Sequence, residues 1–330
     1  MLLVKRSLLG VISLLLITGA VWAWLNRQEI YDWQVVNSYT PTDEIAAIPT
    51  GASMTDRGKF LFYATEPVIS EAEEFNQSCS RREATAAILG CYDGINIYIY
   101  RIDAPELDGI REVTAAHEML HVAWSRLSDS ERDRLGSHLE QVYERIKTDE
   151  LEERMGYYGR QQPGERLNEL HSILATEVVE LDDTLERHYA RYFSDRQVVV
   201  GLHTTYEKVF SELQQRSEIL RKEVEAMVEA LNTDITTYNI AVETLNAETR
   251  THNDRFHTVD RTDSAAVDAY NTAQALLTTR RVRLDQEKNA LDQRQIIYQQ
   301  KVQEYNNLIV RSETLTSSMN SLKSSSETTE

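Results

Sequence analysis

The amino-acid sequence predicts an α+β protein that is mostly α-helical, and three observations support this prediction. An uncharged apolar run occupies residues 7–25, strand-like segments are confined to the first third of the chain, and apolar residues recur at helical spacing in the C-terminal half. We therefore expect an N-terminal transmembrane helix (1–25), a small mixed domain (26–201), a long antiparallel coiled-coil hairpin (202–316) and a disordered tail (317–330).

The apolar run follows Lys5 and Arg6 and would extend about 28 Å as a helix, close to the hydrocarbon thickness of a bilayer. Positive charge on that flank predicts a cytoplasmic N-terminus, which would leave the rest of the chain outside the cytoplasm. The small residues around Trp22 permit a second interpretation, a signal peptide that is cleaved so that the protein is secreted. We favour the anchor, and with it a single-pass protein of the cell membrane, because of the length of the run.

The acidic composition argues against two kinds of partner. The formal net charge of the chain is −18, so the phosphate backbone of a nucleic acid would repel it. The same charge argues against a protein that lies flat on an anionic membrane. We therefore expect no nucleic-acid partner.

Two segments before residue 105 are typical of β-strands, because residues 59–63 and 95–102 are rich in β-branched and aromatic side chains. The second strand could line a cleft and pair with an extended peptide; an ordinary sheet strand is the alternative. Cys79 and Cys91 lie between the two segments. In an exported protein such a pair is expected to form a disulfide, with two buried free thiols as the alternative.

The clearest chemical signal is the sequence Ala-Ala-His-Glu-Met-Leu-His at residues 115–121, inside a run that predicts a helix over residues 110–127. Side chains four residues apart share one helical face, so His117 and His121 can bind one metal ion while Glu118 lies beside the open coordination position. This is the arrangement of a zinc hydrolase, in which zinc lowers the pKa of its bound water to about 7 and a carboxylate takes the proton. The alternative is a chance occurrence of these residues on a helix.

Two further helices are expected downstream. Ser128 and Glu131 are spaced as a capping box, which opens a helix that reaches about Arg154. Residues 157–164 are then expected to form a loop that contains two tyrosines, and residues 165–180 a second helix.

A catalytic zinc ion needs a third protein ligand, and the second of these helices offers two carboxylates. Glu169 shares a face with Ser172 and Thr176, small residues that would let another helix approach closely. Glu177 flanks the apolar stripe of the helix, where an unpaired carboxylate would be costly to bury without a cation. We expect Glu169 to be the ligand and keep Glu177 as the alternative.

The H-E-x-x-H sequence at residues 117–121 is followed by N-E-x-x-S at residues 168–172. This pair of motifs resembles the gluzincin metallopeptidases, and it implies a zincin-like domain with three zinc ligands and a glutamate general base, here His117, His121, Glu169 and Glu118. The chain departs from the family at Ile173, where the family has an aspartate that steadies a ligand histidine, and in the longer spacing between the motifs.

Two histidines are weaker candidates for the third ligand. His171 lies on the other flank of the apolar stripe. His138 is considered because H-E-M-L-H followed by a later histidine is similar to the SprT-like proteases, although Arg and Glu residues around His138 indicate a surface position. For an oxyanion donor, no spacing rule selects between the tyrosines of the expected loop and His171.

From Tyr206 to Leu245 apolar residues recur mostly at steps of three, four and seven, and after a polar break at residues 257–263 they recur every seven from Tyr270 to Tyr305. This pattern predicts the antiparallel hairpin, as a surface for a protein partner or for self-association. The Ser- and Thr-rich tail is expected to be disordered.

These features predict an outward-facing zinc-dependent peptidase that acts on a peptide or protein substrate. The alternative function, from a different class, is a non-catalytic envelope scaffold that acts through its coiled coil and carries a structural or decayed metal site.

Overall fold

The computed structural model describes residues 2–79, 88–161 and 164–321, and of residues 2–13 and 161 the backbone alone. The chain divides into two compact units, one of residues up to Phe210 together with those from Thr314 onward, the other of Ser211–Glu313. Helices make up most of the described residues in both units. One small sheet, in the first unit, is the only sheet found among these residues.

The expected transmembrane helix over residues 1–25 is corrected by the structure. Helix α1 spans Leu2–Leu25, but among the described residues no helix is both long and apolar enough to cross a membrane. A membrane span needs about 20 consecutive apolar residues.

Among the residues described up to Tyr189, nine further helices build the first unit. Short helices are capped locally: the hydroxyl oxygens of Thr42 and Thr55 accept hydrogen bonds from the amides of Ile45 and Gly58. The bounds are α2 (Arg27–Ser38), α3 (Asp43–Gly51), α4 (Asp56–Tyr63), α5 (Ala72–Ser78), α6 (Ile110–Ser125), α7 (Asp129–Ile146), α8 (Asp149–Gln161), α9 (Arg166–Glu177) and α10 (Asp183–Tyr189), with a 3-10 turn at Pro105–Leu107.

The strand predicted at residues 59–63 is wrong, because this segment forms the end of helix α4. The Thr55 cap starts the helix, and Leu61 and Phe62 turn into the core, with relative exposures of 1% and 0%. Local capping and burial thus outweigh the preference of aromatic residues for strands.

The sheet has the strand order β1-β3-β2, with β1 at Val68–Ser70, β2 at Gly90–Tyr92 and β3 at Ile97–Tyr100. Strand β3 pairs parallel with β1 and antiparallel with β2. The strand predicted at residues 95–102 is therefore confirmed in its central part, but it has neighbours on both sides. A peptide cannot pair with it, and among the described strands β2 is the edge strand on the side of the antiparallel pair.

Cys79 and Cys91 form the predicted disulfide, with a Cα–Cα distance of 5.9 Å. The bond joins the residue after α5 to the middle of strand β2. Residues 80–87 of the enclosed segment lie outside the described residues.

Helix α6 is the centre of the first unit. It begins after Gly109, whose φ of +90° suits a residue without a side chain, and a Cβ there would come within 2.8 Å of Leu202 Cδ2. Most side chains of α6 are buried, because α3, α4, α9 and the strands β2 and β3 pack around this helix.

The helix expected to run from Ser128 to about Arg154 is interrupted. Ser128 and Glu131 form the predicted capping box, but α7 ends at Ile146, and α8 begins at Asp149. The two tyrosines assigned to a loop, Tyr157 and Tyr158, instead lie on α8.

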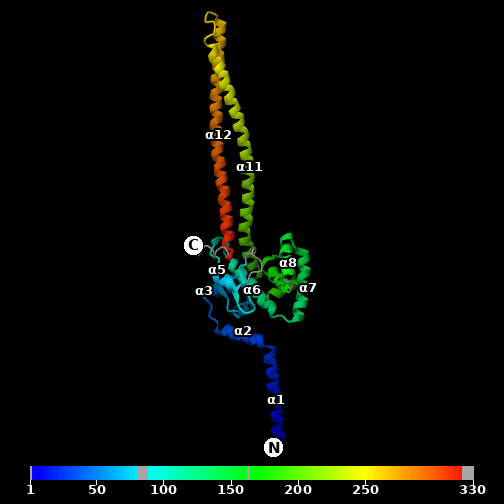
Figure 1. Ribbon diagram of the computed structural model, residues 1–330. Helices are drawn as coiled ribbons and strands as arrows, with labels where there is room; N and C mark the ends of the chain where they lie inside the picture. Colours follow the sequence, from blue (N-terminus) through cyan, green and yellow to red (C-terminus); the bar gives the residue numbers. More distant parts are fainter. Residues whose placement is uncertain (1, 80–87, 162–163, 322–330) are drawn as a thin grey trace. The chain divides into compact units, whose positions relative to one another are not determined.

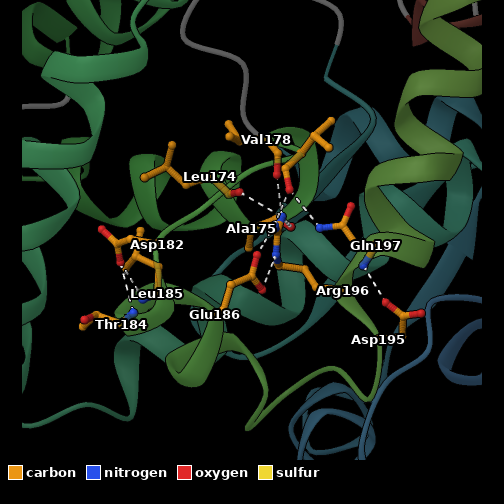
Figure 2. A network of polar contacts seen from close by, with 11 residues as sticks. Leu174, Ala175, Val178, Asp182, Thr184, Leu185, Glu186, Asp195, Arg196 and Gln197 are labelled. Atoms are coloured by element: carbon orange, nitrogen blue, oxygen red, sulfur yellow. Dashed lines mark hydrogen bonds and ion pairs between the residues drawn. The ribbon is translucent and has the colours of Figure 1, made fainter.

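The C-terminal end of α9 is held by a buried arginine, Arg196, in the network drawn in Figure 2. Its guanidinium group donates to the carbonyl oxygens of Ala175, Val178 and Val179 at 3.1, 2.6 and 2.9 Å, and to both carboxylate oxygens of Glu186. Arg196 therefore satisfies carbonyl groups that a helix end leaves without intrahelical partners.

The second unit consists of the long stretches of α11 (Arg196–Arg255) and α12 (Ser264–Ser318) that fall within Ser211–Glu313. The two helices run side by side in Figure 1, and their cross-helix ion pairs show that they are antiparallel. The pairs are Arg216–Glu304, Glu223–Lys301, Asp234–Arg294 and Glu248–Arg280.

The tail expected to be disordered from residue 317 begins in ordered structure. Ser318 is the last residue of α12, and Ser321 is buried, with its hydroxyl 2.7 Å from Asn76 Oδ1. Residues 322–330 lie outside the described residues.

Candidate metal centre

His117, His121 and Glu169 lie together and could hold one metal ion. One ligand atom of each residue lies within 4.8 Å of the others. His117 Nε2 is 3.4 Å from Glu169 Oε2, and His121 Nε2 is 3.7 Å from Glu169 Oε1. Two imidazole nitrogens and a carboxylate, with a further position open, are the ligand set of many catalytic zinc sites.

The histidines reach the same point because they lie one helical turn apart on α6. Their ring centroids are 4.9 Å apart and the rings are nearly perpendicular, at 79°. His121 is almost fully buried and His117 is partly exposed, so the site lies at the boundary between core and solvent.

Glu169 arrives from α9, which packs directly on α6. Ser172 and Thr176 are completely buried, as expected for small residues at a close helix contact. The carboxylate of Glu169 projects from the same face, and this is why a residue 48 positions after His121 in the chain can approach its ring.

Asn168 supports His121 from behind. The side-chain nitrogen of Asn168 donates to Glu165 Oε2 at 2.8 Å, which turns its carbonyl oxygen toward His121 Nδ1 at 2.9 Å. Because that oxygen can only accept, the proton of the neutral imidazole lies on Nδ1 and the lone pair of Nε2 points toward the site. Asn168 thus takes the role expected of the aspartate that is Ile173 in this chain.

The three side chains interact strongly with one another. Burial alone would raise the pKa of Glu169, but the charges of His121 and His117 and the hydrogen bond with His117 lower the pKa below its usual value. Burial alone would lower the pKa of His117, yet its interactions with Glu169 and Glu118 raise the pKa. Two imidazole nitrogens and a carboxylate oxygen, all within reach of one point, form a donor set that can hold a divalent metal ion.

Glu118, the proposed general base, is buried at 6% relative exposure beside the two histidines. Burial raises the pKa of Glu118, and the nearby rings of His121 and His117 act in the opposite direction. The backbone amide of Tyr92, on strand β2, also lowers the pKa of Glu118. A divalent cation next to this carboxyl group would favour its charged form.

Tyr158, one of the tyrosines considered as an oxyanion donor, lines the cleft beside Glu169. It lies on helix α8 and not in the loop expected over residues 157–164. Burial and the neighbouring charge of Glu169 raise the pKa of Tyr158, so the hydroxyl keeps its proton.

Glu177, the alternative ligand, is engaged elsewhere. Its Oε2 lies 2.5 Å from Arg154 Nη2 and 3.8 Å from His203 Nε2. The cation that the buried carboxylate needs is thus Arg154. Glu177 and Arg154 still line the same cleft as the metal cluster.

The two histidines considered as ligands lie apart from the cluster. His171 is fully buried against Trp124, and its Nε2 lies 2.9 Å from His188 Nε2. His138 Nε2 is 3.0 Å from Asp182 Oδ1, so it forms an ion pair at the start of α10.

A cleft of about 1160 Å³ opens over the cluster. Strand β2 lines one part of it, helices α8 and α9 another, and the first turns of α11 a third. The lining includes Gly90, Tyr92, Arg154, Tyr158 and His203. A site of this volume accommodates several residues of an extended peptide.

Comparisons of this chain with protein-family models, with curated proteins and with solved structures found no match.

Proposed function

We propose that this protein is a metal-dependent peptidase that uses zinc. The observation that carries the proposal is the convergence of His117, His121 and Glu169 on one point, with Glu118 buried at their side and an open cleft above them. A structural zinc site or a surface ion pair would not need a further carboxylate, here Glu118, next to an open coordination position. A catalytic site does need one.

Zinc bound by these three residues would supply an acidified water and a positive charge for the oxyanion. Glu118 accepts the proton of the attacking water and later delivers it to the amine nitrogen that leaves. The protonated hydroxyl of Tyr158 faces Glu169 and steadies the charged form of this ligand carboxylate. Asn168 holds His121 in the tautomer that binds a metal.

The substrate we propose is a peptide or protein segment in an extended conformation. Strand β2 borders the cleft and is an edge strand, so those of its outward main-chain groups that do not contact Glu118 can meet an extended backbone. This replaces the role expected for the strand at residues 95–102, which is paired on both sides.

The experiment that tests the function is hydrolysis of an unbiased peptide mixture, followed by mass spectrometry, for the wild type and the Glu118→Gln variant. The wild type loaded with zinc should release new termini. Glu118→Gln should bind the same amount of zinc and hydrolyse peptides at least about 100-fold more slowly, because the amide cannot accept a proton.

Undiminished hydrolysis by Glu118→Gln would rule out the mechanism. If the purified wild type neither binds zinc nor cleaves any peptide, the alternative of a scaffold that acts through its helical hairpin is favoured.

A further inference from the structure

Strand β2 and helix α6 come closest at Gly90. A Cβ atom at this position would lie 2.6 Å from Thr114 Cγ2, 2.9 Å from Glu118 Cγ and 3.0 Å from Glu118 Oε1. These distances are shorter than van der Waals contact, so a side chain at residue 90 would have to displace Glu118 or the strand. The absence of a side chain at Gly90 therefore makes room for the Glu118 carboxylate.

Tyr92, two residues after Gly90 on strand β2, turns its main-chain amide toward the Glu118 carboxylate. Along β2, residues whose main-chain N–H and C=O groups point toward β3 alternate with residues whose main-chain groups point toward the other edge of the sheet. Tyr100 N donates to Leu89 O and Asp93 N donates to Asn96 O, so residues 89, 91 and 93 face β3. The amide of Tyr92 faces the other edge, on the side of Glu118, and it lowers the pKa of the Glu118 carboxyl group.

Cys91 lies between these two residues, and its disulfide ties the strand to the core. Cys79, at the other end of the bond, is 2% exposed and packs with Ala72, Phe75 and Tyr100. Strand β2 is only three residues long, and a ladder of this length gives little independent stability. The disulfide thus supplies a second attachment at the middle of the strand.

We propose that Gly90, the Tyr92 amide and the Cys79–Cys91 disulfide form a positioning device for Glu118. The disulfide fixes β2 in place. Strand β2 then offers Glu118 the space above Gly90, which has no side chain, and the main-chain amide of Tyr92 as a donor. The device acts on the base, because the atoms nearest to a Cβ at Gly90 belong to Thr114 and Glu118. Its catalytic meaning rests on the proposed peptidase function.

The direct test is amide hydrogen exchange of Tyr92, which requires neither zinc nor activity. The wild type is compared with Cys79→Ser/Cys91→Ser and with Glu118→Ala, at equal content of α-helix by circular dichroism. Exchange of the Tyr92 amide should be at least about tenfold faster in both variants, while amides in the middle of α6 keep their protection. Unchanged protection of Tyr92 in either variant would overturn the proposal.

A second route avoids the double substitution if that variant does not fold. The disulfide is the only one the chain can form, because the sequence has two cysteines, so a phosphine reductant acts on this bond alone. Reduction of the folded wild type should accelerate Tyr92 exchange, and reoxidation should restore protection. Protection that persists after complete reduction would contradict the role of the disulfide.

The catalytic consequence is tested with Gly90→Ala against a matched control, Gly51→Ala. A Cβ at Gly51 would also crowd a glutamate of α6, at 2.9 Å from Glu112 Cγ, but Glu112 lies outside the cleft. Gly90→Ala should lower kcat about 10- to 100-fold, with KM and zinc content unchanged, and Gly51→Ala should leave all three near wild type.

Equal kcat for Gly90→Ala and the wild type would refute the positioning role. An inactive wild type in which Tyr92 exchange responds as expected would instead refute the peptidase function and leave the contact between β2 and Glu118 established.

Discussion

The side-chain oxygen of Asn168 lies 2.9 Å from Nδ1 of His121, while the side-chain nitrogen of Asn168 donates to Glu165. This pair of contacts fixes both the orientation of the amide and the tautomer of the imidazole. Asn168 is the neighbour of the expected ligand Glu169 in the second motif, and it orients the expected ligand His121 of the first. The contact therefore links the two motifs. Four predictions follow from this arrangement and from its surroundings.

Replacing Asn168 with Leu should weaken zinc binding about 10- to 100-fold, because His121 loses the acceptor that holds its ring and its tautomer. Asn168→Asp keeps an acceptor at that position and should bind zinc within about threefold of the wild type. The measurement is a competition titration with a chelator of known affinity. Equal affinities for Asn168→Leu and the wild type would show that the contact is incidental.

Glu169 and Glu177 should respond differently to replacement by Gln. Glu169→Gln should reduce zinc affinity by at least about 100-fold, because the ligand carboxylate is lost. Glu177→Gln should retain zinc but lower the free energy of unfolding by about 1–3 kcal/mol, because Arg154 loses its partner. Zinc content after dialysis and urea denaturation measure the two effects, and loss of zinc in Glu177→Gln alone would exchange the roles of the two residues.

Acid should destabilise the fold through His188. Burial lowers the pKa of His188 to about 4, so the folded protein holds this ring neutral while the unfolded chain protonates it near pH 6.5. Stability should therefore fall as the pH falls from about 6.5 to 4, by on the order of 3 kcal/mol from this group.

The check on His188 is urea denaturation at several pH values for the wild type and His188→Gln. Gln cannot titrate, so its unfolding free energy should depend less steeply on pH between 4 and 6.5. Parallel curves for the two proteins would exclude His188 as the source of the acid sensitivity.

Arg196→Met should lower the free energy of unfolding by about 3 kcal/mol, because the network of Figure 2 loses its donor and leaves Glu186 and the carbonyl groups at the end of α9 unsatisfied. Arg187→Met is the control, since Arg187 is exposed and, among the described residues, donates to the carbonyl oxygen of Asp183 alone, so its effect should stay within about 0.5 kcal/mol. Similar losses for both variants, measured by thermal or urea unfolding, would contradict this account of Arg196.

Periodicity located α6, α9, α11 and α12, and the capping box located the start of α7, but the short helices α2, α3, α4, α5 and α10 were not predicted. Residues 59–63 have the composition of a strand and form a helix because Thr55 caps them and Leu61 and Phe62 enter the core. The break between α7 and α8 has no glycine or proline to mark it, whereas Gly159 and Pro163 predicted a loop from residue 157 although α8 continues to Gln161. The N-terminal span was expected from composition, and no described helix has the required length and apolar character.

For the site, spacing along one helix was enough to group His117 and His121, and the small residues beside Glu169 indicated which face of α9 meets α6. The support from Asn168 and the contact of strand β2 with Glu118 could not be predicted in this way. Both depend on how elements far apart in the chain pack, and the local sequence carries no period or motif for such contacts.

The central claim is that His117, His121 and Glu169 share one zinc ion beside a general base that does not bind it. The most direct measurement is the zinc content per chain, after dialysis against a weak chelator, of the wild type and of His121→Ala, Glu169→Ala and Glu118→Gln. We expect about one zinc ion per chain in the wild type and Glu118→Gln, and almost none in the other two. Zinc retained at wild-type level by Glu169→Ala, or absent from the folded wild type, would contradict the claim.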